Sequence, residues 1–86
     1  MKFVSYSDPG HGWVKVKKSF LKELGLADKI SRFSYERKDY AYLEEHRDLS
    51  LFVRMLEYKG IPFEFKNNYS NKSSKIRTYL SYQAAA

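Results

Sequence analysis

The sequence predicts an α+β fold, in which a small antiparallel or mixed sheet is covered on one face by two helices. Its 86 residues suit a single core, and a hydrophobic content of 43%, with eight Tyr and six Phe, is too high for a disordered chain. Strand-like segments come in pairs separated by short turns, which is typical of hairpins. Each pair is followed by a segment with helical spacing, whose apolar side needs a sheet to pack against. The expected order is ββαββαβ, in one domain over residues 1–82.

The first two strands are predicted at residues 3–6 and 13–16, where β-branched and aromatic side chains dominate. The hexapeptide between them contains Pro9, which fixes φ, and two glycines, which permit the backbone angles of a turn. We expect Asp8 in this turn to accept hydrogen bonds from nearby backbone amides. The two strands are therefore expected to form a hairpin.

A short amphipathic helix is predicted over residues 20–24, because apolar side chains recur there at helical spacing. Ser19 is its expected N-cap, and Gly25 marks its C-terminal end. Residues 30–35 and 39–44 then alternate at period two, with a charged turn between them. This pattern predicts a second hairpin.

The clearest element is a second helix, which is capped by Asp48 or Ser50 and ends at Gly60. Residues 61–65 predict a final strand, and Pro62 at its start places that strand near an edge, because proline cannot donate to a neighbouring strand. The apolar side chains that share one face of the second helix are Leu49, Phe52, Val53 and Leu56.

The C-terminal part of the chain is less regular. Residues 67–74 are polar and read as a loop. Residues 75–82 fit either a short strand or an ordered tail, and the pattern does not choose between them. Residues 83–86 are expected to form a disordered tail.

The composition excludes several classes of function. The chain has no Cys, which removes disulfides, thiolate nucleophiles and Cys-ligated zinc. It has neither an apolar run long enough to span a membrane nor a signal peptide, so we expect a cytoplasmic protein with no membrane partner. It shows no phosphate-binding glycine loop and no nucleophile motif, so neither an enzyme nor a cofactor is predicted. A core of this size supplies only about 3 to 5 kcal/mol, which leaves a homodimer open.

The net charge of +6 is unevenly distributed. Residues 1–38 carry nine Lys/Arg against four Asp/Glu, residues 62–86 carry four against one, and the middle of the chain is acidic. Lys and Arg neutralise phosphates while Tyr rings stack on unpaired bases, so the leading hypothesis is a non-catalytic protein that binds DNA or RNA. The plain alternative is that the charge only keeps the protein soluble. The residues predicted to contact phosphate are Lys15, Lys17, Lys18, Lys22, Lys75 and Arg77.

A second hypothesis is a protein–protein inhibitor or modulator that acts on a host protein. Trp, Tyr and Arg contribute most of the energy at protein interfaces. His11 and Trp13, with neighbouring Tyr, would then form an exposed aromatic anchor. Burial of Trp13 on the monomer would weaken this hypothesis, and an exposed apolar patch around the turn would favour it.

The string from Asp8 to Gly12, which contains His11, resembles the strand-end motif of zinc-dependent cell-wall amidases, in which the histidine of the motif is a metal ligand. The resemblance implies a third, hydrolytic hypothesis with His11 as a ligand. A catalytic zinc normally has three protein ligands, and the further candidates here are His46 and a carboxylate such as Glu44. Because no pattern in the sequence predicts that these three residues meet, a structural turn is the expectation and no metal ligand is assigned.

Two longer stretches resemble known families. The run from Gly12 to Glu45, with a strand, a short helix and Leu-Gly-Leu, is similar to AbrB-type swapped-hairpin domains, which implies an obligate dimer that binds DNA through basic residues. More of the chain resembles a family of short proteins that are encoded by phages, prophages and plasmids and carry Asp-Pro-Gly-His-Gly-Trp near the start. This second resemblance implies a mobile-element setting and supplies no functional residue. Its further landmarks are Lys29-Ile30-Ser31, Phe33-Ser34-Tyr35, Tyr42-Leu43-Glu44-Glu45 and the segment reaching Arg77.

Overall fold

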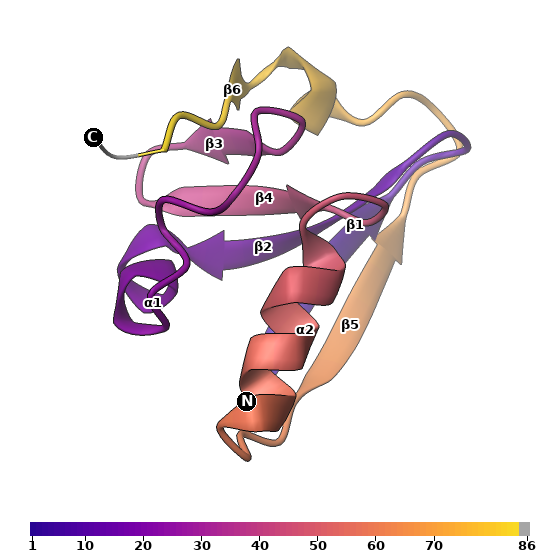
Figure 1. Cartoon of the computed structure of the whole chain (residues 1–86). Coiled ribbons are helices and arrows are strands. Elements are labelled where there is room, and N and C mark those ends of the chain that lie inside the picture. Colours follow the sequence, from indigo (N-terminus) through magenta and orange to yellow (C-terminus); the bar gives the residue numbers. More distant parts are fainter. Residues whose placement is uncertain (85–86) are drawn as a thin grey trace.

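The computed structural model describes residues 1–84, which form a six-stranded mixed sheet with two α-helices (Figure 1). The strand order is β5-β1-β2-β4-β3-β6, and within this sheet the β1–β5 pair is parallel while the other pairs are antiparallel. The predicted α+β class is confirmed, and the order ββαββαβ is extended by a sixth strand. Neither α-helix of the described chain is long and apolar enough to cross a membrane. The elements are β1 (Lys2–Ser7), β2 (Gly12–Lys17), α1 (Lys18–Glu23), β3 (Tyr35–Arg37), β4 (Tyr40–Glu44), α2 (Leu49–Tyr58), β5 (Glu64–Tyr69), a 3₁₀ helix η1 (Lys75–Thr78) and β6 (Leu80–Ser81).

One face of the sheet packs against both α-helices. Alternate residues of the strands point to this face, so Phe3, Val14 and Leu43 are buried in one cluster with Leu21 of α1 and Phe52 of α2. The last two side chains are completely shielded from solvent. Figure 1 shows α1 and α2 on the same side of the sheet, as the sequence predicts.

The opposite face, which we call the open face, carries aromatic and basic side chains. Trp13 and Tyr42 are buried there beneath Ile76 of η1, in a second cluster that is separate from the main core. We call residues 74–79, which include η1, the cover segment. The cover segment shields the middle of the open face and leaves its rim exposed. The half-buried rings around this second cluster are Tyr6, Tyr35, Tyr40 and Tyr79.

Helix α1 begins directly after β2, at Lys18. Its N-cap residue is Lys17, which makes no side-chain cap, so the prediction of Ser19 as the N-cap is wrong. The backbone N–H of Lys18 donates instead to the carbonyl of Asp39 (2.8 Å), and this bond satisfies one of the free amides at the start of the helix. The predicted end of the helix is confirmed, since Gly25 has a φ of 73°.

The strand predicted over residues 30–35 is a loop as far as Ser34. A buried carboxylate holds this loop, because Asp48 accepts hydrogen bonds from the backbone N–H (3.0 Å) and the hydroxyl (2.8 Å) of Ser31 and from the hydroxyl of Ser34. The hydroxyl of Ser34 in turn accepts from the N–H of Glu44 (2.9 Å). Asp48 is the N-cap residue of α2, yet its side chain fastens the loop to β4 and does not cap the helix.

The chain re-enters the sheet later than predicted. The strand expected at residues 61–65 is β5, which runs from Glu64 to Tyr69, so the prediction of a loop is wrong for residues 67–69. Its position at an edge of the sheet is as expected. Residues 75–82 contain η1 and β6, so neither of the two simple alternatives describes them fully. Within the predicted tail, residues 83–86, the N–H of Gln83 donates to the Glu36 carboxylate (3.3 Å), and residues 85 and 86 lie outside the described part of the chain.

Gly60, which follows α2, has a left-handed φ of 68°. Open space surrounds the position that a Cβ would take, so the cost of a side chain is conformational and not steric. We expect Gly60→Ala to lower the free energy of unfolding by about 1 kcal/mol, measured by urea denaturation. Lys59→Ala is the matched control, because φ at Lys59 is −85° and suits any residue. Equal stability of the two variants would contradict the conformation found at Gly60.

Candidate functional site

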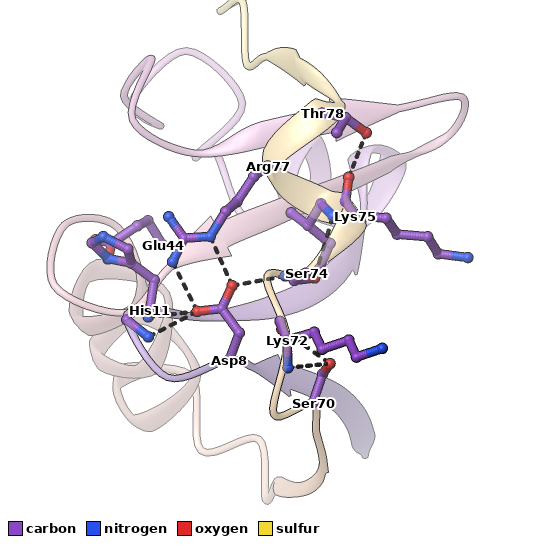
Figure 2. Close-up of polar contacts among 11 residues, drawn as sticks. Asp8, His11, Glu44, Ser70, Lys72, Ser74, Lys75, Arg77 and Thr78 are labelled. Carbon is purple, nitrogen blue, oxygen red and sulfur yellow. Dashed lines mark hydrogen bonds and ion pairs between the residues drawn. The ribbon is translucent and has the colours of Figure 1, made fainter.

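The turn between β1 and β2 is organised by one carboxylate, that of Asp8 (Figure 2). Its Oδ1 accepts hydrogen bonds from the N–H groups of Gly10 (3.0 Å) and His11 (2.9 Å), as the sequence predicts. The N–H of Asp8 donates to the carbonyl of His11 (2.9 Å) and closes the turn. The string from Asp8 to Gly12 is therefore a structural turn with a defined hydrogen-bond pattern.

The same carboxylate also binds the cover segment. Nε of Arg77 donates to Oδ2 of Asp8 (2.7 Å) and Nη2 donates to Oδ1 (2.8 Å), while the N–H of Ser74 donates to Oδ2 (2.8 Å). The Arg77 guanidinium, followed by the Ser74 amide, holds the pKa of Asp8 well below its ordinary value. The Asp8 carboxylate in turn raises the pKa of Arg77. We call this bidentate Asp8–Arg77 ion pair the clip; Figure 2 shows how it ties the turn to the cover segment.

Gly10 is needed for close approach and not for backbone angles, whereas Gly12 lies against the end of an exposed side chain that can move. Neither has a left-handed φ, so the expectation that they permit unusual turn angles is wrong. A Cβ on Gly10 would lie 2.8 Å from Nη2 of Arg77, and one on Gly12 would lie 2.5 Å from Oε2 of Glu45. Because the clip holds Arg77 in place, a side chain at position 10 would disturb the ion pair itself.

A cleft of about 400 Å³ lies beside the clip and brings both histidines to one place. Nδ1 of His11 lies 3.4 Å from Oε1 of Glu44, and Oε2 of Glu44 accepts from the N–H of His46 (2.8 Å). Trp13 forms part of the cleft wall with only 2% of its surface exposed, and the Arg77 guanidinium lies 5.4 Å from its ring centroid. Trp13 is therefore not an exposed anchor, which weakens the predicted form of the protein-binding hypothesis, whereas His11 is accessible.

Two of the candidate metal ligands, Glu44 and His46, line the cleft, and Glu45 lies between them in the sequence, outside its lining. Glu44, Glu45 and His46 each have a ligand atom within 4.8 Å of the others. Nε2 of His46 faces Oε1 of Glu45 (3.2 Å), however, while His11 faces Glu44, so the two imidazoles approach different carboxylates and not a common point. We describe these contacts as two His–carboxylate pairs and place no metal in the cleft.

A second hollow, of about 440 Å³, lies on the open face between the cover segment and the β3–β4 turn; we call it the basic groove. Nζ of Lys15 lies 4.1 Å from the ring centroid of Tyr40, and the Arg37 guanidinium lies 5.2 Å from that of Tyr79. Among the residues that line the groove, Asp39 is the single carboxylate. The cations that line the groove are Lys15, Arg37, Lys38 and Lys75.

These four cations have no carboxylate partner within ion-pair distance in residues 1–84. Burial raises the pKa of Tyr42, and the neighbouring Tyr79 raises it further, so the ring at the floor of the groove stays neutral. The groove therefore combines uncompensated positive charge with the edges and faces of aromatic rings.

Three of the six cations predicted to contact phosphate lie at or beside the basic groove. Lys15 and Lys75 line it directly. Lys17 is exposed on the open face and lines an adjoining hollow together with Lys15 and Tyr40.

The other three predicted cations lie elsewhere. Nζ of Lys18 pairs with Oε2 of Glu36 (3.5 Å). Lys22 is exposed on α1, outside the residues that line the groove. Arg77 has its guanidinium engaged by Asp8, so its charge is already neutralised. Half of the cations predicted to contact phosphate therefore lie together at the groove, and the other half lie apart from it.

Arg37 and Lys38 were missed because the second hairpin was expected to turn over residues 36–39. In the structure Arg37 pairs directly with Tyr40, which leaves only Lys38 and Asp39 in the turn. A two-residue hairpin turn fixes the register of its strands, and that register would have placed Arg37 on the same face as Tyr40. The positive φ of 54° at Lys38 suits such a turn.

No family model, curated protein or solved structure matches this chain.

Proposed function

We propose that this chain is a non-catalytic binding protein of a mobile element and that its basic groove engages single-stranded nucleic acid. The observation that carries the proposal is the groove itself, which gathers four cations without a carboxylate partner among residues 1–84 against half-buried tyrosine rings on one face of a sheet. The phosphates would contact the cations, and unpaired bases would stack on the rings.

The charge of the groove favours a polyanion. Four cations face one carboxylate there, and a charge imbalance confined to a hollow attracts an anionic chain more strongly than the same charges dispersed over the surface. Each phosphate that is neutralised also releases a condensed counterion, which adds to the affinity at low salt.

The aromatic rings favour a single strand over a duplex. Tyr6, Tyr40 and Tyr79 are half-buried and line the same hollow as the cations. Stacking on such rings requires base faces, and these are free only when the bases are unpaired. A base stacked on an aromatic side chain contributes about 1 to 3 kcal/mol, and the contribution depends little on sequence.

The cleft supports protein binding as a second candidate function. Phe33 stands on its rim with 49% of its surface exposed, and the Arg47 guanidinium lies 4.3 Å from its ring centroid. Arg and aromatic side chains are typical interface anchors, and His11 lies on the same rim. In this form the contact residues of a modulator would be His11, Phe33 and Arg47, while Trp13 only supports them from beneath.

A salt titration tests the nucleic-acid proposal. Four phosphate contacts to a single strand predict a log–log slope of about −2.8, so the affinity for a fluorescein-labelled dT or rU oligomer should fall about 50-fold between 50 and 200 mM NaCl, measured by anisotropy. A duplex of equal length and inorganic polyphosphate serve as competitors, because neither offers an unpaired base face. A flat salt dependence would refute the proposal, and so would equal competition by the unlabelled single strand, the duplex and polyphosphate.

A further inference from the structure

One edge of the sheet is β5, a six-residue strand that contains no proline and keeps a continuous register with β1. Strand β5 is outermost in Figure 1, and every one of its side chains is exposed. Exposed edge strands normally carry a proline, a bulge or charged side chains, or are very short, because unpaired backbone groups invite another strand. Here Pro62 lies before β5, and the charged residues of the strand are Glu64 at its start and Lys66. Within the described chain, β5 pairs on its inner side with β1.

The backbone of β5 presents a regular row of donors and acceptors to solvent. The N–H groups of Glu64 and Ser70 donate to the carbonyls of Met1 (2.9 Å) and Ser7 (2.8 Å), so even-numbered residues face β1 at both ends of the strand. N–H and C=O of successive strand residues point to alternate sides. The residues whose backbone groups point outward are therefore Phe65, Asn67 and Tyr69.

From this row we infer that β5 pairs antiparallel with β5 of a second copy of this chain, about a two-fold axis at Asn67. In that register Asn67 lies opposite Asn67 of the second copy and Phe65 lies opposite Tyr69, so all the outward backbone groups of both strands are paired. These opposed residues lie on the same face, which a two-fold axis perpendicular to the sheet requires.

The side chains of β5 suit this register. Phe65 and Tyr69 are 38% and 64% exposed, and the pairing would join them as cross-strand aromatic pairs on the helix side. On the open face Lys66 would lie opposite Asn68, so no like charges meet. A register centred on Lys66 would instead place that lysine opposite itself, which is unfavourable.

The pairing would place the open faces of two copies side by side in one continuous sheet. On the proposed nucleic-acid function, a strand would then meet two basic grooves on the same surface, and the number of phosphates contacted would double. The pairing itself rests on the backbone and side chains of β5 and does not depend on that function.

Cysteine cross-linking tests the pairing sharply, since the chain contains no Cys. At the proposed axis the two Cα atoms at position 67 would be about 5.5 Å apart, within disulfide range, whereas those at position 68 would be more than about 7 Å apart. We expect Asn67→Cys to form a covalent dimer at least about tenfold faster than Asn68→Cys under mild oxidation. Asn67→Pro removes an outward N–H together with the side-chain hydrogen bonds of Asn67 to Ser5 and Ser7, whereas Asn67→Ala removes only those side-chain bonds. Asn67→Pro should therefore shift the dimer to monomer in sedimentation equilibrium, while Asn67→Ala should remain a dimer.

Circular dichroism of each variant shows whether its fold is retained. An unmodified chain that sediments as a monomer at 100 μM would overturn the pairing, and so would a dimer in which positions 67 and 68 cross-link at the same rate. The anisotropy titration measures nucleic-acid binding independently of cross-linking and sedimentation. Failure of the β5 pairing can therefore be distinguished from failure of nucleic-acid binding.

Discussion

Removing the four cations of the basic groove is expected to lower the affinity for a single-stranded oligomer on the order of a thousandfold at 50 mM NaCl. Phosphate contacts contribute little to the affinity at about 1 M salt, and a log–log slope of about −2.8 accumulates to this factor when the salt falls to 50 mM. The substitutions are Lys15→Gln, Arg37→Gln, Lys75→Gln and Lys38→Asn, where Asn tolerates the left-handed φ of 54°. Anisotropy at several salt concentrations measures both the loss and the flattened slope.

The matched control removes the same charge from the helix side of the molecule. Lys22→Gln, Lys29→Gln, Arg54→Gln and Lys59→Gln alter exposed residues, again three lysines and one arginine, none of which lines the groove. Long-range attraction alone would weaken binding equally in both variants. Binding through the groove requires the control to keep most of its affinity and its salt slope, and a comparable loss in the two would refute a localised site.

Breaking the clip with Asp8→Asn is expected to release the cover segment at neutral pH. The amide side chain keeps an oxygen for the turn but loses the charge and the bidentate geometry that hold Arg77. Trp13, the only tryptophan, is buried beneath Arg77 and Ile76, so its fluorescence should shift to the red as it becomes hydrated. Lys75 and Tyr79 would leave the groove with the segment, so oligomer binding should weaken in parallel.

The pH dependence of this effect has a definite sign. The pKa of Asp8 in the folded protein lies below its unfolded value, so the clip stabilises the fold fully above about pH 4, where the unfolded carboxyl is ionised. The stabilisation declines as the pH falls below that value toward the folded pKa. The difference in urea stability between the unmodified chain and Asp8→Asn should therefore be constant from pH 5 to 8 and shrink in acid.

Asp28→Asn is the control for the clip, because Asp28 is an exposed acid on a loop. It should leave both the Trp13 emission and its pH profile unchanged. A difference between the unmodified chain and Asp8→Asn that grows in acid would show that the clip does not stabilise the folded state.

The sheet and helices could be predicted from the sequence because local patterns specify them. Turn residues around Pro9 marked the first hairpin, and the helical spacing that ends at Gly60 marked α2. Residues 30–34 were misread because their loop is fixed by Asp48, a residue distant in sequence whose carboxylate replaces the hydrogen bonds of a strand. The later start of β5 likewise depends on pairing with β1.

The candidate site was predicted only in part, because charge counts do not say which cations lack partners. Lys15 and Lys75 were identified, and the structure brings them together although sixty residues separate them. Arg77 looked equivalent to them in the sequence, yet its contact with Asp8 makes it a structural residue. Arg37 was overlooked because the predicted turn, residues 36–39, included it, whereas β3 extends to Arg37 and pairs this residue with Tyr40.

The clip joins residue 8 to residue 77, and this span has a consequence for the order in which the protein matures on the ribosome. The hairpin with Trp13 is synthesised first, whereas Arg77 and Ile76 emerge among the last residues of the described chain. Until then nothing covers Trp13 and Tyr42, so the nascent chain exposes the aromatic surface that the complete protein buries. Translation that stalls before residue 77 would thus release a fragment with exposed aromatic side chains, which chaperones and proteases should recognise more readily than the complete fold.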